Sequence, residues 1–184
     1  MLHQVIILLE LIIVCAVLLA VERISYVLIW RRPARFAEFV AKLPVATSPV
    51  DALRTLFVLF KCMQLGVFLA WFILLGGSWL PVPSAAGAIL VLGLILILFG
   101  QVLNFSVFWR LGKVGVFYGN RLGHKVPWVT SFPFNVVSHP QYVGTLLSIW
   151  GLFLIMRYPH PDWLILPIIQ TIYYLIAMRL ERAA

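Results

Sequence analysis

The sequence is poor in charged residues and poorest in acidic ones. Only 11% of its 184 residues are charged, with six Asp and Glu against fourteen Lys and Arg, while 63% are hydrophobic. The mean hydropathy is +1.04. Soluble domains are about half apolar and about a quarter charged, so this composition excludes a soluble globular protein. We expect the chain to lie in a lipid bilayer, where backbone polar groups are paired inside helices or a closed barrel.

Several motifs of common enzyme chemistry are absent as well. There is no GxGxxG after a strand, no Walker sequence, no HExxH and no Ser-His-Asp set. These absences weigh against hydride, phosphoryl and zinc chemistry. The two cysteines, Cys15 and Cys62, lie inside apolar runs without CxxC or zinc spacing. We interpret them as small buried hydrophobic residues, and no metal is expected.

Long apolar runs make up most of the chain. They are continuous rather than alternating, which favours helices over a membrane barrel. At about 20 residues per span, there is room for at most about five or six crossings. We predict an all-α integral membrane protein, a single domain over residues 1–184, with about five membrane-embedded helices and a C-terminal helical hairpin. The helices are expected at about residues 4–30, 55–80, 84–109, 140–157 and 163–181.

The start of the chain is expected to belong to the mature protein. Its first 30 residues lack the basic start and the small-residue cleavage site of a signal peptide. They are also long enough to cross a bilayer, so we expect them to remain as the first span.

Basic residues predict the orientation of the chain. In a soluble protein a net charge of +8 would suggest nucleic-acid binding, but in short membrane loops Lys and Arg mark the cytoplasmic side, and no nucleic acid is expected. Residues 31–54, whose three prolines should break any long helix, and residues 110–125 are basic, whereas residues 80–84 are uncharged. The N-terminus is therefore expected outside and the C-terminus inside. Residues 110–139 should lie at the cytoplasmic interface and cover a site.

Ionisable residues occur inside the predicted spans, where a charge is costly. They are Glu10, Glu22, Arg23 and Lys61. Each is a candidate functional group. The alternative for the last three is that their side chains extend to the helix end and the interface. Glu10 lies deeper and has no evident partner. The sequence leaves both interpretations open.

Small and polar residues gather around the end of the third predicted span. Four glycines lie three or four residues apart: Gly112, Gly115, Gly119 and Gly123. On a helix they would share one face, either for close helix packing or for a ligand groove lined by backbone. Gln101 and Asn104 share a face of the span just before them. They are expected to bond to a ligand or to a neighbouring helix.

A dense polar cluster, His139-Pro140-Gln141-Tyr142-Val143-Gly144, precedes the fourth predicted span. Proline suits the first position of a helix, and free backbone N–H groups there favour an anion or a nucleotide-like ligand. Taken alone, His139 is equally consistent with a solvated or structural histidine.

Four stretches together resemble the phospholipid N-methyltransferases, especially the small plant-type enzymes. These are residues 99–105 (FGQVLNF), 111–119 (LGKVGVFYG), 127–135 (PWVTSFPFN) and 139–144 (HPQYVG). The match runs almost without gaps over about residues 95–150, and weaker similarity continues to Glu181. Animal and fungal relatives have Gly-x-Gly where this chain has Leu98-Phe99-Gly100, and a Glu-Glu pair where it has Glu181-Arg182.

The resemblance implies an integral membrane enzyme without a Rossmann domain. It would use S-adenosylmethionine to methylate the headgroup amine of phosphatidylethanolamine, or its mono- and dimethyl forms, toward phosphatidylcholine. The implied cofactor-binding residues are Gly100, Gln101, Tyr118, Val129, Thr130, Phe134, His139, Pro140, Tyr142, Gly144 and Glu181. Candidates for accepting the amine proton are Glu181, His139 and His124. Candidates for holding the lipid phosphate are Arg110, Lys113, Arg121 and Lys125.

Two other functions remain open from the sequence. One is a methyltransferase on the same scaffold for a different membrane acceptor, such as an isoprenylcysteine-type carboxylate. The other is a small non-enzymatic membrane protein or transporter whose polar residues only pack helices. The sequence does not predict the oligomeric state.

Overall fold

The structure, a computed structural model, describes residues 2–44 and 48–182. Within these residues it contains helices and no strands, which confirms the predicted all-α fold. The elements are α1 (Leu2–Arg31), α2 (Pro33–Ala41), α3 (Pro49–Gly76), α4 (Gly87–Val116), α5 (Pro140–Arg157), the 3-10 turn η1 (Pro161–Leu164) and α6 (Ile165–Arg182).

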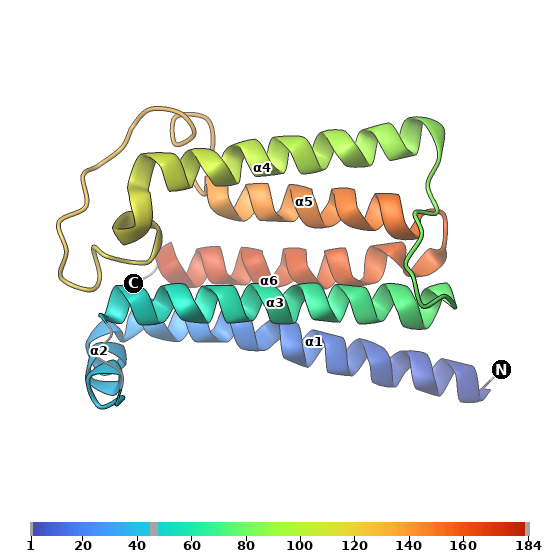
Figure 1. Cartoon of the computed structure of the whole chain (residues 1–184), viewed down its shortest axis with the longest axis horizontal. Helices are drawn as coiled ribbons and strands as arrows, with labels where there is room; N and C mark the ends of the chain where they lie inside the picture. The colour runs from blue at the N-terminus through green and yellow to red at the C-terminus, as the bar shows by residue number, and fades with distance from the viewer. Residues whose placement is uncertain (1, 45–47, 183–184) are drawn as a thin grey trace.

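The long helices lie side by side, with their connections at the two ends (Figure 1). Helix α4 packs mainly on α5, whereas α1 packs on α6 and α3. One end of the bundle carries α2, residues 117–139 and the last turn of α6, and we call it the basic end. The N-terminus and the connection between α3 and α4 lie at the opposite end. The two basic segments of the sequence are therefore on the same side of the bundle, as predicted.

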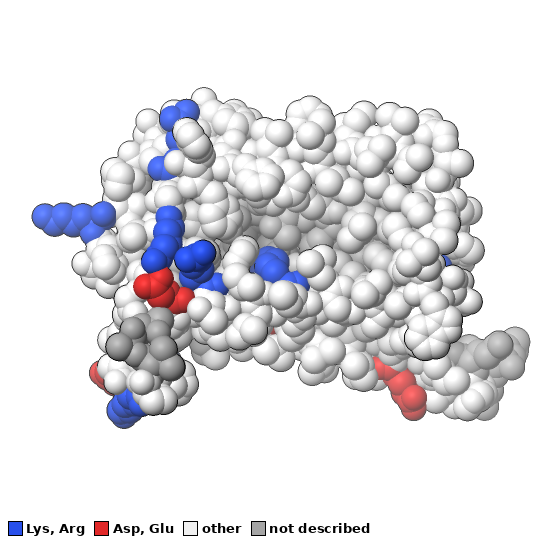
Figure 2. Space-filling model, in the orientation of Figure 1, with Lys and Arg blue, Asp and Glu red and all other residues white. Residues whose placement is uncertain are grey.

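Within the described residues, four helices are long and apolar enough to cross a membrane, judged by length and composition. They are Val5–Arg31, Pro49–Gly76, Gly87–Val116 and Pro161–Glu181. The 18-residue α5 packs beside α4 at the position of the fourth predicted helix, but it is not among the four that meet this criterion. Most Lys and Arg visible in Figure 2 gather toward the basic end, and the rest of that face is largely uncharged. The chain is a multi-pass membrane protein.

Exposed tryptophans mark both ends of the spans. Trp79 follows the end of α3, whereas Trp109 and Trp128 lie at or near the basic end, and all three are largely exposed. Tryptophan is favoured where hydrocarbon meets the headgroups, because its ring is apolar and its N–H is polar. Their distribution fits a bundle with an interface at each end.

Several helix boundaries differ from the predicted ones. Helix α3 starts at Pro49 rather than near residue 55, because the Ser48 hydroxyl accepts a hydrogen bond from the Asp51 backbone N–H at 3.1 Å. The long helix α1 ends at Arg31, just before Pro33, as predicted, but the short helix α2 that Pro33 begins was not predicted. Helix α4 continues beyond residue 109 to Val116.

The prediction that four glycines share one helical face was wrong. Helix α4 ends at Val116, and Gly112 and Gly123 have φ angles of 60° and 85°, which are not helical. Close helix packing by glycine occurs elsewhere, between α4 and α5. A side-chain carbon added to Gly144 would lie 2.6 Å from the Gly100 carbonyl oxygen, and one added to Gly151 would lie 2.5 Å from that of Gly93.

This packing predicts that Gly151→Ala separates α4 from α5 and destabilises the protein by about 1–3 kcal/mol through overpacking. Thermal unfolding of the purified protein in detergent would measure the loss. The matched control is Gly66→Ala on α3, where an added carbon meets nothing within 4 Å. Equal unfolding temperatures for the two variants would contradict the proposed packing role.

An ion pair closes the hairpin of α5 and α6. The Arg157 guanidinium donates to both carboxylate oxygens of Asp162, at 2.8 and 2.7 Å. The Trp71 indole N–H donates to the same carboxylate at 3.1 Å, which ties the hairpin to α3. This cluster lies at the end of the bundle opposite the basic end.

Candidate active site

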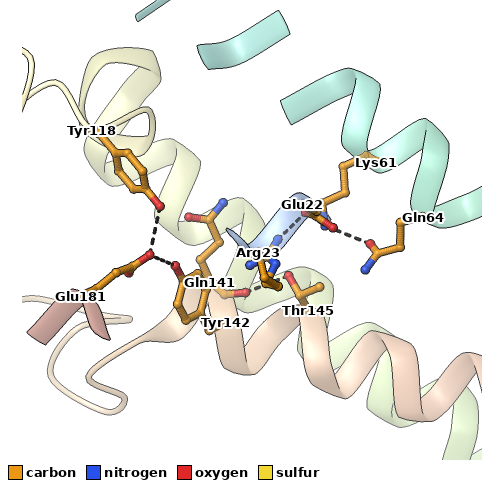
Figure 3. Close-up of polar contacts among 9 residues, drawn as sticks. All are labelled: Glu22, Arg23, Lys61, Gln64, Tyr118, Gln141, Tyr142, Thr145 and Glu181. Atoms are coloured by element: carbon orange, nitrogen blue, oxygen red, sulfur yellow. Dashed lines mark hydrogen bonds and ion pairs between the residues drawn. The ribbon is translucent and has the colours of Figure 1, made fainter. Parts of the chain in front are cut away.

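At the basic end, two tyrosine hydroxyls converge on one carboxylate. Glu181, in the last turn of α6, accepts a hydrogen bond from Tyr142 at 2.6 Å and another from Tyr118 at 3.1 Å, both at Oε1 (Figure 3). The Trp30 indole N–H donates to the Glu181 backbone oxygen at 3.0 Å. Residues from α1, α5, α6 and the turn after α4 therefore meet here, and we call Tyr118, Tyr142 and Glu181 the tyrosine–carboxylate cluster.

Tyr118 is held in an unusual backbone conformation. Its φ angle is 56°, in the left-handed region that bulky residues rarely adopt. Its ring packs edge-on against Trp30 at 5.0 Å and Tyr26 at 6.4 Å. Burial raises the pKa of Tyr118 well above its ordinary value, and the Glu181 carboxylate adds to this effect. The phenol therefore stays neutral and serves as a hydrogen-bond donor.

The start of α5 places Tyr142 in the cluster. Pro140 takes the first helical position, and the ring of His139 stacks on Tyr142 with centroids 5.9 Å apart. The backbone N–H groups of Tyr142 and Val143 donate to the His139 carbonyl oxygen at 3.1 Å each. These two backbone N–H groups are therefore already hydrogen-bonded, which makes an anion site at this helix start less favourable.

A buried charge cluster lies deeper in the bundle. The Glu22 carboxylate is fully buried, pairs with the Arg23 guanidinium, and lies 3.1 Å from the ammonium of Lys61. The Arg23 guanidinium also lies over the rings of Tyr174 and Tyr142, at 4.2 and 5.8 Å from their centroids. Glu22 and Arg23 thus point into the protein, which favours a functional or packing role over extension to the interface.

Glu10 differs from these residues because it is exposed on the outer surface of α1. None of the ion pairs among the described residues involves it.

Two neighbouring hollows are lined by members of both clusters, although neither Glu181 nor Glu22 lines them. The first, which we call the inner cavity, has an empty volume of about 460 Å³ and is lined by Arg23, Tyr118 and Tyr142 among others. The second, which we call the lateral groove, has an empty volume of about 830 Å³ and lies between α3, α4 and α5. Much of this empty volume is open to solvent, and the space that holds a water-sized sphere is about 50 Å³ in the inner cavity and about 290 Å³ in the lateral groove. Only the lateral groove therefore approaches the size of a small-molecule site, about 300 Å³ or more. Figure 2 shows a hollow in this face of the molecule with a basic side chain beside it.

Four residues line both hollows where these adjoin, and we call them the shared wall: Phe57, Lys61, Gln141 and Thr145. The remaining lining of the lateral groove is mainly aromatic and aliphatic, with polar groups from α3, α4 and α5. A polar ligand at the basic end and an apolar ligand in the lateral groove would therefore be neighbours across this shared wall.

The predicted residues of α4 and α5 lie partly in the helix interface. Gln101 lines the lateral groove and donates to the Ser148 hydroxyl at 2.9 Å, so it bonds to a neighbouring helix. Asn104 lines the same groove, and its buried Oδ1 has no hydrogen-bond partner among the described residues. Gly100 and Gly144 are buried against each other between the two helices.

Most predicted site residues of the interfacial segment, residues 110–139, do not bond to the tyrosine–carboxylate cluster. Val129 is half-buried and Thr130 exposed, while Phe134 packs on a core of aromatic and aliphatic residues at the basic end. His124 and Lys125 are exposed, and within the described chain neither has a hydrogen bond or ion pair to the tyrosine–carboxylate cluster.

Three of the four predicted phosphate-binding residues have partners inside the protein. Arg110 donates to the Phe132 carbonyl oxygen at 3.2 Å, and Lys113 pairs with Asp51. The Arg121 guanidinium lies 4.3 Å from the centroid of the Trp30 ring. These contacts stabilise the basic end and leave these three cations less available for a ligand.

Several site residues were not predicted from the sequence. Tyr26 and Tyr174 contact Arg23, while Gln64 and Thr145 line the lateral groove. The signal for Gln64 was available, because an amide inside an apolar run needs a partner just as a charge does. The tyrosines carried no such signal, since tyrosine is common wherever a span approaches its interface.

Comparison with known proteins gives one family. The family model described as "Phospholipid methyltransferase" matches residues 88–184. An Arabidopsis thaliana phosphatidyl-N-methylethanolamine N-methyltransferase is 54% identical over 54 residues, which are 29% of this chain and 33% of that protein. The rat phosphatidylethanolamine N-methyltransferase is 35% identical over 91 residues, 49% of this chain and 45% of the relative.

A yeast relative gives the same picture. The Saccharomyces cerevisiae phosphatidyl-N-methylethanolamine N-methyltransferase is 37% identical over 91 residues, which are 49% of this chain and 43% of that protein. The chain thus spans less than half the length of these three curated relatives. No solved structure matches it.

Proposed function

This chain belongs to the phospholipid methyltransferase family, and on that basis we propose that it methylates the headgroup amine of phosphatidylethanolamine or its mono- and dimethyl forms, toward phosphatidylcholine. The methyl donor is S-adenosylmethionine. Residues 1–184 act as one membrane methyltransferase domain, with the basic end in the cytoplasm and the N-terminus outside. The observation that carries this proposal is the wall shared by the inner cavity and the lateral groove.

The residues beside the inner cavity fit an adenosyl sulfonium donor. Glu181 offers a carboxylate for an amino group or ribose hydroxyls, and only its Oε1 takes part in the hydrogen bonds of the described chain. The rings of Tyr118 and Tyr142 offer π faces to a cation. When bound, the donor supplies an electrophilic methyl group. Glu181, Tyr118, Tyr142 and His139 would hold it.

The lateral groove fits a lipid acceptor. It lies between two helices that are apolar enough to span the membrane, and its aromatic and aliphatic lining suits acyl chains. A lipid amine reaching the shared wall would meet the inner cavity from the bilayer side. Methyl transfer is an in-line displacement, so the protein's main contribution is to align the two reactants.

The acceptor amine must be neutral to attack. Partial dehydration among apolar side chains lowers the pKa of an ammonium and eases its deprotonation. Glu181 and His139, which both contact Tyr142, are the proposed proton acceptors. His124 is exposed and away from these contacts, which makes it the weakest of the three candidates.

The test is methyl transfer by the purified protein in phosphatidylethanolamine vesicles, using S-adenosylmethionine labelled in its methyl group. Base-stable label in the phospholipid is the expected result. Base-labile label on a carboxylate would instead support another acceptor on the same scaffold. Failure of the folded protein to bind S-adenosylmethionine or its demethylated product would contradict the proposal.

The hydrogen bond from Tyr142 predicts a moderate effect on donor binding. Tyr142→Phe keeps the ring but removes the 2.6 Å bond that orients Glu181, so we expect roughly 2- to 10-fold weaker S-adenosylmethionine affinity in calorimetry. Tyr158→Phe, in the turn at the opposite end, is the matched control and should bind normally. Wild-type affinity in Tyr142→Phe would reject this role of the bond.

A further inference from the structure

The lateral groove carries an excess positive charge. Glu22, Arg23 and Lys61 form one cluster with one negative and two positive charges. No Asp or Glu lines either hollow among the described residues. The charged groups of Glu22 and Arg23 are buried, whereas the Lys61 side chain is 26% exposed and lines the groove. The excess charge is therefore presented to the groove by the Lys61 ammonium.

Gln64 adds an unpaired donor next to this ammonium. Its side-chain oxygen accepts a hydrogen bond from Lys61 at 2.9 Å, which orients the amide. The amide nitrogen is buried, and it has no hydrogen-bond partner among the described residues. Gln64 is only 4% exposed, yet it lines the groove. A buried N–H without an acceptor is unfavourable, so the arrangement favours an acceptor supplied from outside the chain.

The depth of this cluster restricts what the acceptor is. Lys61 lies twelve residues after Pro49, about 18 Å along α3 at 1.5 Å per residue. An uncompensated charge is costly at this depth. The groove around it is lined by Leu65, Phe68, Phe105 and Phe108, which suit hydrocarbon chains. An anion with apolar chains would place its charge at Lys61 and its chains against the apolar lining of the groove.

We propose that Lys61 and Gln64 bind the phosphodiester of a phospholipid in the lateral groove. The ammonium neutralises the phosphate charge, and the Gln64 amide N–H donates to a phosphate oxygen. This inference rests on the proposed function, because it defines how the acceptor lipid is held. It also assigns the phosphate to a residue outside the four basic candidates of the interfacial segment. Lys61 has an internal partner too, but it shares the single Glu22 carboxylate with Arg23, which leaves one positive charge uncompensated.

Binding of a lipid that cannot be methylated tests the site separately from catalysis. Native mass spectrometry of the full chain in detergent would compare phosphatidylglycerol, which has a phosphodiester but no amine, with diacylglycerol, which lacks the phosphate. We expect Lys61→Met to bind phosphatidylglycerol about 10- to 100-fold more weakly than the wild type. Lys61→Arg keeps the charge and should retain binding within a few-fold, and diacylglycerol binding should not change.

Two further variants complete the comparison. Gln64→Leu keeps the ammonium and should weaken phosphatidylglycerol binding by roughly 2- to 10-fold, so the proposal stays testable if Lys61→Met does not fold. Lys42→Met removes an exposed lysine beyond α2 and should have no effect. Wild-type phosphatidylglycerol binding in both Lys61→Met and Gln64→Leu would overturn the proposal. Displacement of the lipid by an equal concentration of inorganic phosphate would overturn the assignment to a lipid.

Discussion

Glu181→Gln is expected to weaken S-adenosylmethionine binding by about 10- to 100-fold. The change keeps the size of the side chain and removes the negative charge on which Tyr118 and Tyr142 converge. A hydrogen bond to a charged group contributes more than one between neutral groups, so the loss should exceed that of Tyr142→Phe. Calorimetry with the purified protein in detergent measures it directly.

The control for this variant is Glu38→Gln. Glu38 is exposed on α2, away from both hollows, and its replacement removes the same charge from the same end of the protein. It should bind the donor with wild-type affinity. Equal affinities for Glu181→Gln and the wild type would remove Glu181 from the cofactor site.

Glu22→Gln is expected to destabilise the protein by about 3–5 kcal/mol. Glu22 is fully buried and is the only acidic partner of Arg23 and Lys61 among the described residues. Without it, the cluster would hold two neighbouring cations and no counter-charge, and the Arg23 guanidinium is buried away from water. Chemical unfolding of the protein in mixed detergent micelles would report the change in the free energy of unfolding.

Two further variants show whether the loss of stability in Glu22→Gln comes from charge or from packing. Glu22→Gln combined with Lys61→Gln returns the cluster to a single excess positive charge, so the double variant should be more stable than Glu22→Gln alone. Glu10→Gln removes a carboxylate from the exposed surface of the same helix and should change the stability little. If the double variant were less stable than Glu22→Gln, mutual repulsion of the cations would not explain the loss.

The positions of the helices followed from hydrophobic runs, but their ends did not. A run of apolar residues fixes which segment is buried in lipid, whereas a boundary depends on a few local bonds. Helix α3 starts earlier than predicted because of the Ser48 cap, and the nine-residue helix that begins at Pro33 was not predicted. The glycine face failed for the same reason, since Gly112 breaks the helical geometry that the spacing assumed.

Some residues of the candidate site were predicted from the sequence, whereas most of their contacts were not. Tyr118, Tyr142 and Glu181 were predicted from family resemblance, and the structure brings these three together. The partner of Lys61 could not be predicted from the sequence, because Glu22 is distant in sequence and meets Lys61 only through the packing of α1 on α3. The internal partners of Arg110 and Lys113 were equally unpredictable, since they depend on how the interfacial segment and α3 approach α4.

The most direct test is a structure of the protein bound to S-adenosylhomocysteine in a phosphatidylethanolamine nanodisc. We predict the adenosyl ligand beside Tyr118, Tyr142 and Glu181, with its sulfur directed toward Lys61 and Thr145 of the shared wall, and a lipid headgroup that reaches these residues from the lateral groove. An adenosyl ligand bound away from this cluster, or a lateral groove closed by the protein's own side chains, would contradict the account.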